Sequence, residues 1–357
     1  MFTAIHNLTA PLRPEELDDY LSRGWRPTGQ AIYTAHYLRT EADELHGCIQ
    51  IRLPLGGFTF KKRHRKLLRR NARRFRVTYG RAAAPDAATL AVNARYMALH
   101  ADRSREDLEV HVTGEYGYRV LDTQQVRVYD GDKLVAFSYF DLGRRTAYAK
   151  AGIYDPAYAD ASLGVYTMLL EIAWLQQRGV AYYHPGYVSP TYPAFDYKLR
   201  FGSVEYYRID SGTWAAFDPA HPVDPYAVVE AKLDRLRQYL NGLEVVARVL
   251  EYPSYTARYH ARSAELDMLD AALVLYLGKI AGGTDLVAVY DPVRAHYALL
   301  EVRDSGLRDT RLRQNGSGRY PRLLVPVMVD WVVACATSPA GLARALARRL
   351  LVTTAEK

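Results

Sequence analysis

The chain has 357 residues, of which 49% are apolar and 24% charged, as in a soluble globular protein with a sizeable core. Two cysteines, Cys48 and Cys335, exclude a disulfide framework and a four-thiolate zinc site. The N-terminus lacks the basic and apolar pattern of a signal peptide, and the longest apolar run, from Leu323 to Ala336, is too short to span a membrane. We therefore expect a cytoplasmic protein of two or three domains with no membrane association.

The net charge of +8 has a local origin. Ten Lys/Arg and no acid lie between Lys61 and Arg76, so the remaining chain is close to neutral. A solvated helix normally interleaves acids with its basic residues, and this density of one sign repels itself. The pattern favours an anionic partner, and we interpret it as an RNA-binding helix. Its expected phosphate contacts are Lys61, Lys62, Arg63, Arg65, Lys66, Arg69, Arg70, Arg73 and Arg74.

The first 80 residues are predicted to form a small N-terminal subdomain. It begins with a helix over Pro14–Ser22, and two β-rich segments follow, Ile32–Arg39 and Gly47–Leu55, which we expect to pair with each other. The basic helix follows from Lys61 to Arg74, and Phe75–Tyr79 is typical of a strand.

Residues 81–220 are predicted to form an acetyltransferase-like core of class α+β, with a mixed sheet and flanking helices. A meander of three strands ends at Ile153, and the turn Asp130-Gly131-Asp132 joins the first two strands. Ser162 is expected to cap the next helix, which runs to Gln177. The three strands of the meander are Tyr118–Tyr129, Leu134–Asp141 and Thr146–Ile153. Two further strands are predicted over Val180–Tyr183 and Val204–Asp210, and two further helices over Ala87–Ala101 and Tyr192–Leu199.

Residues 221–357 are predicted to form a helix-rich accessory domain without a recognisable chemical motif. The sequence favours helices over Tyr226–Leu240, Leu243–Leu250, Ala261–Ile280 and Pro339–Leu351.

The strand-to-helix turn before Leu163 is the first candidate site. Free backbone N–H groups at a helix start bind an anion or a carbonyl oxygen, and in acetyltransferase-like folds the phosphate of the acyl donor lies at this position. The alternative is an ordinary helix start with no ligand. The candidate substrate-binding residues are Ser162, Leu163, Gly164, Val165, Tyr166, Gly186, Tyr187 and Asp196.

Several short segments, taken in their order, resemble the aminoacyl-tRNA–protein transferases, the arginyl and leucyl enzymes of the N-end rule. The segments that carry this resemblance are Gly24-Trp25-Arg26, Cys48–Arg52, Tyr154-Asp155-Pro156, Ser162-Leu163-Gly164, Glu171-Ile172, Gly186-Tyr187, Tyr197-Lys198 and Glu205. The resemblance implies an acetyltransferase-like core and transfer of an amino acid from aminoacyl-tRNA to an amine, as on a protein N-terminus.

The family's N-terminal cysteine cluster is missing, since Cys48 is the only cysteine of that region. A metal is therefore not expected, and the acceptor is less well defined than the donor. No cofactor is expected apart from aminoacyl-tRNA as co-substrate, and the expected partners are tRNA and a protein or peptide with a free N-terminus.

Four residues are candidates for the chemistry: Lys198, Tyr197, Glu205 and Asp155. Lys198 suits an RNA phosphate or the oxyanion of the tetrahedral intermediate, or it pairs with Asp196 at the surface. A carboxylate that takes the proton of the amine is sufficient for an already activated ester, but carboxylates near turns also act as helix caps. Tyr187, after Pro185-Gly186, is the tyrosine expected to be exposed for base stacking.

Two other functions remain open on sequence alone. An acyl-CoA-dependent N-acyltransferase, which uses acetyl-CoA, has the same core, although the segment Ala159–Gly164 lacks the basic residue and the glycines of its phosphate loop. A non-catalytic RNA-binding protein on a degenerate transferase fold is the second alternative.

Overall fold

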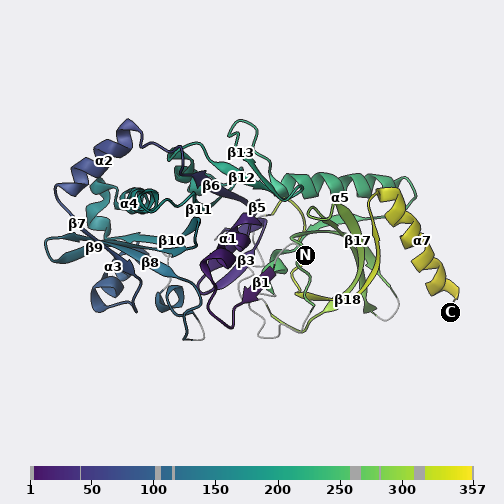
Figure 1. Ribbon diagram of the computed structural model, residues 1–357. Coiled ribbons are helices and arrows are strands. Elements are labelled where there is room, and N and C mark those ends of the chain that lie inside the picture. Colours follow the sequence, from purple (N-terminus) through teal and green to yellow (C-terminus); the bar gives the residue numbers. More distant parts are fainter. Residues whose placement is uncertain are drawn as a thin grey trace.

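A computed structural model describes residues 4–40, 42–100, 106–114, 117–257, 267–280, 283–308 and 318–355. Two sheets lie side by side along the molecule, one of eight strands and one of five (Figure 1). The N-terminal strands and the first helix lie between them. The candidate residues from Asp155 to Glu205 all belong to the half with the eight-stranded sheet.

The eight-stranded sheet is mixed, as expected for the predicted α+β core. One neighbouring pair, β10 and β11, is parallel, and the other pairs are antiparallel. In spatial order the strands are β13 (Thr213–Ala216), β12 (Glu205–Arg208), β6 (Ile49–Pro54), β11 (Tyr182–Val188), β10 (Thr146–Tyr154), β9 (Lys133–Leu142), β8 (Thr123–Asp130) and β7 (Arg76–Arg81).

Helices cover both faces of this sheet (Figure 1). On one face α4 (Leu163–Gln177) and α2 (Lys62–Ala72) cover a core that includes Ile51 and Phe140. On the other face α3 (Ala87–Met97) covers a second core. Because successive strand residues point to opposite faces, β9 supplies Phe140 to one core and Tyr139 to the other.

The N-terminal residues do not form a separate paired hairpin as predicted. The segment Ile32–Arg39 divides into β3 (Ala31–Thr34) and β4 (Tyr37–Arg39), and β4 pairs with β5 (Leu45–Gly47). Strand β6 instead lies inside the large sheet, between β11 and β12. A smaller sheet joins β1 (Ala4–Asn7), β3 and β2 (Arg26–Thr28), next to α1 (Pro14–Ser22).

The prediction of a helix-rich C-terminal part is wrong. The predicted helix over Leu243–Leu250 is replaced by β14, and that over Ala261–Ile280 contains β15, its first residues lying outside the described part of the chain. A short apolar run such as LVLYL fits a buried strand as well as a helix, so periodicity alone does not separate them. The five antiparallel strands are β14 (Arg248–Glu251), β15 (Leu273–Lys279), β16 (Asp285–Asp291), β17 (His296–Asp304) and β18 (Val327–Ala336).

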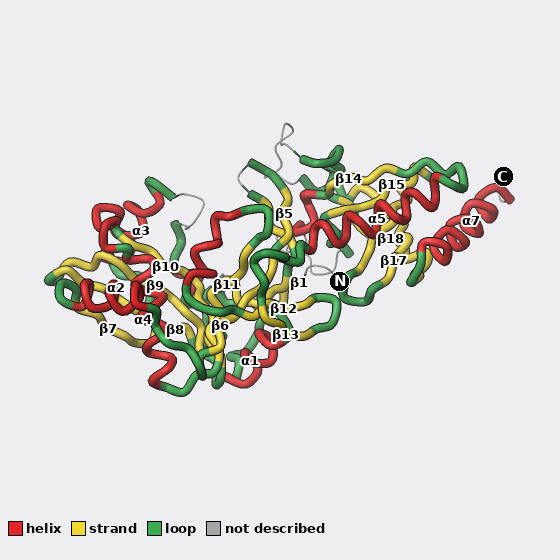
Figure 2. The backbone as a smooth tube through the Cα atoms, turned by 90° about the horizontal axis from the view of Figure 1, so that it is seen from above, coloured by secondary structure: helices red, strands yellow, loops and turns green. Residues whose placement is uncertain are grey.

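Two helices in this half were predicted correctly. They are α5 (Pro225–Asn241), which extends along the five-stranded sheet, and α7 (Pro339–Ala355), which ends at the far end of the molecule (Figure 2). A buried ion-pair network ties the loop between β4 and β5 to the C-terminal half, because Arg322 contacts Asp43 at 2.9 Å and Glu251 at 3.6 Å. Within the described residues no helix is both long and apolar enough to cross a bilayer.

Candidate active site

The central feature of the eight-stranded sheet is the divergence of β10 and β11. Their last paired residues are Tyr148 and His184, although β10 continues to Tyr154 and β11 to Val188. A cleft of about 590 Å³ lies at this opening. Residues of both strands line it, from Tyr148 to Gly152 and from Pro185 to Tyr187.

The start of α4 forms one side of the cleft, as predicted for the donor site. Ser162, Gly164 and Val165 line it. The first N–H groups of an α-helix have no partner within the helix, so they are available to an oxygen ligand here. Leu163 and Tyr166 point into the core instead, with 0% and 1% of their surfaces exposed.

The prediction that the Ser162 side chain caps α4 is wrong. Ser162 occupies the left-handed region, with φ 52° and ψ 46°, and its hydroxyl makes no capping bond. This residue forms the sharp turn from the 3₁₀ helix η3 (Pro156–Ala161) into α4. A non-glycine residue in this conformation is uncommon and is frequently found at functional sites.

Lys198 lies on the opposite side of the cleft, on the 3₁₀ helix η4 (Pro193–Arg200). It is buried, and its Nζ donates a hydrogen bond of 3.0 Å to the carbonyl oxygen of Tyr187. The rings of Phe195 and Tyr187 lie 4.7 and 4.8 Å from this ammonium. The pKa of Lys198 is lowered to about 7, mainly by burial and to a smaller extent by the cation Arg26, while Cys48 acts in the opposite direction.

Lys198 makes no ion pair with Asp196, so the surface alternative for this lysine is wrong. Asp196 is exposed and does not line the cleft. Tyr197, the neighbouring candidate, does line it and is 38% exposed. Lys150 also lines the cleft, but its ammonium is already paired with Asp141 at 2.9 Å.

Tyr187 is not the exposed stacking platform that we predicted. Its ring lies 4.6 Å from the Arg26 guanidinium, and the ring of Tyr33 lies 4.7 Å from the same group. Arg26 is buried, and its Nη1 donates to Cys48 Sγ at 3.2 Å. The Arg26 cation thus lies behind the cleft wall, next to Tyr187.

Gly186 brings the backbone close to Lys198. Its φ is +102°, a conformation that side chains rarely adopt, and a Cβ at this position would lie 3.0 Å from Lys198 Nζ. The predicted importance of this glycine therefore has a steric reason.

Two candidate carboxylates lie outside the cleft lining. Asp155 is buried against Arg95 and Lys133, at 2.9 and 3.1 Å, and accepts from the backbone N–H of Ala157. Glu205 forms a 2.7 Å ion pair with Arg52 on the neighbouring strand β6. Both carboxylates have structural partners, so we do not retain them as proton acceptors.

The cleft contains a carboxylate that sequence reasoning missed as a site residue. Glu171, in the middle of α4, lines the cleft and is 1% exposed. The signal was present, because Glu171 is the single charged residue in the apolar stretch Met168–Leu175. A carboxylate is rarely buried in such a position without a reason.

The basic helix α2 lies next to α4 (Figure 1). All ten Lys/Arg from Lys61 to Arg76 are exposed, and among the ion pairs of the described residues only Arg74 has a carboxylate partner, Asp130. Arg70 donates a 3.0 Å hydrogen bond to the carbonyl oxygen of Asp160, two residues before Ser162. The positive surface therefore extends to the mouth of the cleft.

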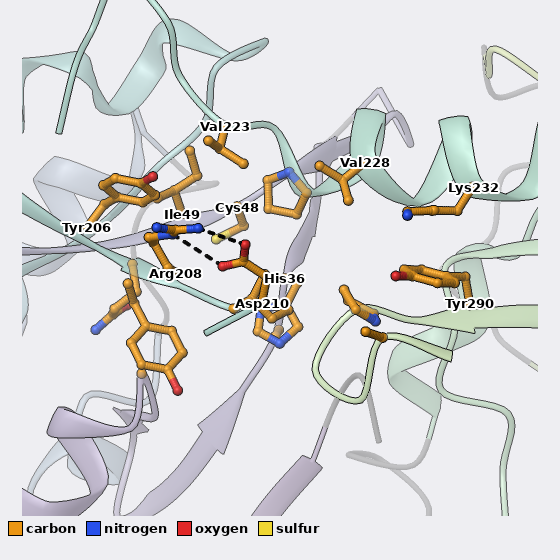
Figure 3. A pocket seen from close by; sticks show the side chains of 18 residues that line it. His36, Cys48, Ile49, Tyr206, Arg208, Asp210, Val223, Val228, Lys232 and Tyr290 are labelled. Carbon is orange, nitrogen blue, oxygen red and sulfur yellow. Dashed lines mark hydrogen bonds and ion pairs between the residues drawn. The ribbon is translucent and has the colours of Figure 1, made fainter. Parts of the chain in front are cut away.

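A second, smaller hollow of about 270 Å³ lies between the two halves (Figure 3). Cys48 and His36 face it from the N-terminal strands, and Lys232 and Tyr290 from the C-terminal half. The pair Arg208–Asp210, at 2.9 Å, projects into it. Burial lowers the pKa of His36 to about 3, so this imidazole is neutral at physiological pH. This hollow contains none of the candidate residues.

Residues 79–208, which include the residues that line the cleft, match the family model described as arginine-tRNA-protein transferase, C terminus. An aspartate/glutamate leucyltransferase of Vibrio cholerae El Tor Inaba is 30% identical over 190 residues, which cover 53% of this chain and 78% of the relative. The chain belongs to the aminoacyl-tRNA–protein transferase family.

A further member of this transferase family has the same name. The aspartate/glutamate leucyltransferase of Leptospira interrogans serovar Lai is 27% identical over 195 residues, covering 52% of this chain and 71% of the relative. Among solved structures, L-PGS from Bacillus licheniformis gives a TM-score of 0.29 at 12% identity, covering 48% of this chain and 50% of that one.

The family model covers the cleft residues from Tyr148 to Lys198 but not the basic helix, which ends before residue 79. Within the described residues no group of three or more His, Cys, Asp or Glu side chains is arranged to hold a metal ion.

Proposed function

We propose that this chain transfers an amino acid from aminoacyl-tRNA to an amine acceptor, the N-terminus of a protein or peptide. The observation that carries this proposal is the junction of a strongly basic surface with a cleft. Arg70, on the basic helix, donates a hydrogen bond to Asp160 in η3, which leads directly into α4, and α4 begins at the cleft. An RNA whose backbone lies along α2 would place its 3′ end at this opening.

The start of α4 would hold the end of the donor. The backbone N–H groups of Leu163, Gly164 and Val165 suit the terminal phosphate of the RNA, because the dipole of α4 adds partial positive charge there. Only the first turn of the helix is required, so the buried side chains of Leu163 and Tyr166 are compatible with this role.

Lys198 would stabilise the oxyanion of the tetrahedral intermediate. In its charged form it places a buried ammonium at the cleft, where a cation stabilises developing negative charge more strongly than in bulk solvent. The carbonyl oxygen of Tyr187 accepts a hydrogen bond from the ammonium, and the backbone of Gly186 lies close to it, so both residues hold the ammonium in place. Tyr197 lines the cleft beside it and would contact the donor or the acceptor.

The names of the relatives suggest the amino acid and the acceptor. Relatives of this chain are named aspartate/glutamate leucyltransferase, so leucine as the transferred residue and an acidic N-terminal residue as the acceptor are the first pair to test.

The experiment supplies the full chain with tRNA charged with labelled leucine, or with labelled acetyl-CoA, and with peptides that begin with Asp, Glu, Ala or Lys. We expect label to move from leucyl-tRNA to the Asp and Glu peptides. Label that moves only from acetyl-CoA would refute the proposal in favour of an acyl-CoA-dependent transferase. Binding of tRNA without any transfer would leave an RNA-binding protein as the function.

A further inference from the structure

Glu171 is the buried carboxyl group of the cleft. It lies in the apolar middle of α4, and within the described residues no Lys or Arg forms an ion pair with it. An isolated ionised carboxylate in such a place is costly, because burial removes its hydration. A structural carboxylate would be expected to have a cation as its partner, as Asp155 and Glu205 do.

Hydroxyl groups surround Glu171 instead. Tyr183 on β11 donates a hydrogen bond of 2.6 Å to Oε2, and the Ser138 hydroxyl on β9 faces the same carboxyl group. Strand β10 lies between these two strands, with Ala147 opposite Tyr183 and Gly152 opposite Ser138. The carboxyl group therefore lies beneath β10, close to the last paired residue before β10 and β11 diverge.

The reaction needs a proton acceptor at this position. An α-amine has a pKa of about 8, so an acceptor enters largely as an ammonium ion at neutral pH and must lose a proton to attack. We propose that Glu171, positioned by Tyr183, is the catalytic residue that takes this proton. This inference rests on the proposed function, since it assigns a base to the same cleft.

The step balances without any further reactant. The ammonium ion of the acceptor gives one proton to the Glu171 carboxylate, and the neutral amine nitrogen then forms a bond to the ester carbonyl carbon while the carbonyl electron pair moves to oxygen. The tetrahedral intermediate breaks its bond to the 3′ oxygen of the tRNA, and that oxygen takes a second N–H proton from the same nitrogen. Glu171 returns its proton to solvent, which restores the carboxylate, and the products are an amide, free tRNA and one proton.

The electrostatics of Glu171 suit this role. Burial raises its pKa to about 7, while the hydroxyls of Ser138 and Tyr183 act in the opposite direction. The titratable groups that face it are Tyr183 from β11 and Tyr79 from β7, and burial raises the pKa of both tyrosines. A base whose pKa is close to the working pH is efficient because it both accepts and returns the proton.

The test compares the wild-type chain with Glu171→Gln in leucyl transfer between pH 5.5 and 9. Glutamine keeps the shape and still accepts from Tyr183, so the fold and tRNA binding should be retained. We expect kcat to fall about 100- to 1000-fold with KM for leucyl-tRNA changed less than threefold. The rise in rate through pH 7 should disappear.

Tyr183→Phe separates positioning from folding. Loss of the hydroxyl removes a bond that favours the carboxylate, so the acidic limb should move to higher pH with a fall in kcat of about tenfold. If Glu171→Gln and Tyr183→Phe both lower the transfer rate by the same factor at every pH, the two residues have only a structural role and the inference is overturned. A Glu171→Gln variant that transfers at the wild-type rate would overturn the role of Glu171 but not the proposed function. A wild-type chain that transfers nothing would overturn both.

Discussion

Replacing Lys198 by methionine should stabilise the protein while it impairs transfer. Burial lowers the pKa of this lysine from 10.5 to about 7, and a difference of about 3.5 pH units corresponds to about 5 kcal/mol at 1.36 kcal/mol per unit. Methionine removes this penalty but loses the hydrogen bond to the Tyr187 carbonyl, which costs about 1 kcal/mol. The expected gain in the free energy of unfolding is about 4 kcal/mol below pH 7.

The gain should depend on pH with a defined sign. The pKa of a cation is lowered in the folded state, so the folded protein releases a proton between about pH 7 and pH 10.5 and the wild type becomes more stable across this window. At pH 9.5 the remaining penalty is about 1 kcal/mol, which the lost hydrogen bond offsets. The advantage of Lys198→Met should therefore nearly disappear at pH 9.5.

Urea denaturation at pH 6.5 and 9.5, followed by tryptophan fluorescence, measures this difference. Lys62→Met removes an exposed lysine from α2 and is the control, with an expected change below about 0.5 kcal/mol at both pH values. A Lys198→Met variant that is less stable than the wild type at pH 6.5 would refute the reasoning, because the ammonium would then have a stabilising partner.

Three further predictions concern other parts of the molecule. Replacing Lys66, Arg69 and Arg73 by Glu should weaken tRNA binding in a filter assay. It should also reduce the slope of log binding constant against log salt concentration by about 2–3, whereas Arg344→Glu on α7 should leave both quantities unchanged. Arg70 is left intact because it donates a hydrogen bond to Asp160. Gly186→Ala should lower the free energy of unfolding by about 1–3 kcal/mol and kcat/KM about tenfold, because it combines a strained φ with a displaced Lys198. Gly57→Ala, whose Cβ would lie in open space, should change neither urea unfolding nor the transfer rate. Arg322→Met should cost about 3–5 kcal/mol in thermal or urea unfolding, since it leaves Glu251 buried without its cation and Asp43 with Arg39 but without Arg322. Arg303→Met breaks an exposed pair and should cost below about 1 kcal/mol, and equal effects of the two substitutions would contradict this view.

The sequence predicted the parts of the site that depend on local pattern. The basic helix, the helix start at Leu163 and the strand order before it follow from charge density, turn residues and alternation, and they place Gly164 and Lys198 at one cleft. The burial of a side chain depends on distant partners. The sequence left Glu205 and Asp155 open between proton acceptors and helix caps, and Asp155 does cap η3 by accepting from the backbone N–H of Ala157. Their ion pairs could not be foreseen, because the partners Arg52 and Arg95 are 153 and 60 positions away.

The same reason explains the errors in the fold. Strand β6 has the pattern of a buried strand, and nothing local distinguishes the nearby β4 from the remote β11 as its neighbour. The C-terminal strands have apolar runs that fit a helix equally well. Glu171 differs from these elements, because a single charged residue inside an apolar helix can be recognised from the sequence alone. Its neighbours Tyr183 and Ser138 are revealed only by the structure.

The position of β6 has a consequence for how the chain is made and divided. Residues 79–208, which match the family model, include β10, β11 and β12 but not the strand that lies between β11 and β12. A fragment of these residues would expose the edge of β11 and leave β12 without its neighbour, so it should aggregate or remain unfolded. During synthesis, β6 leaves the ribosome more than 100 residues before its two partners, and it has a neighbour on both sides only when β12 has emerged.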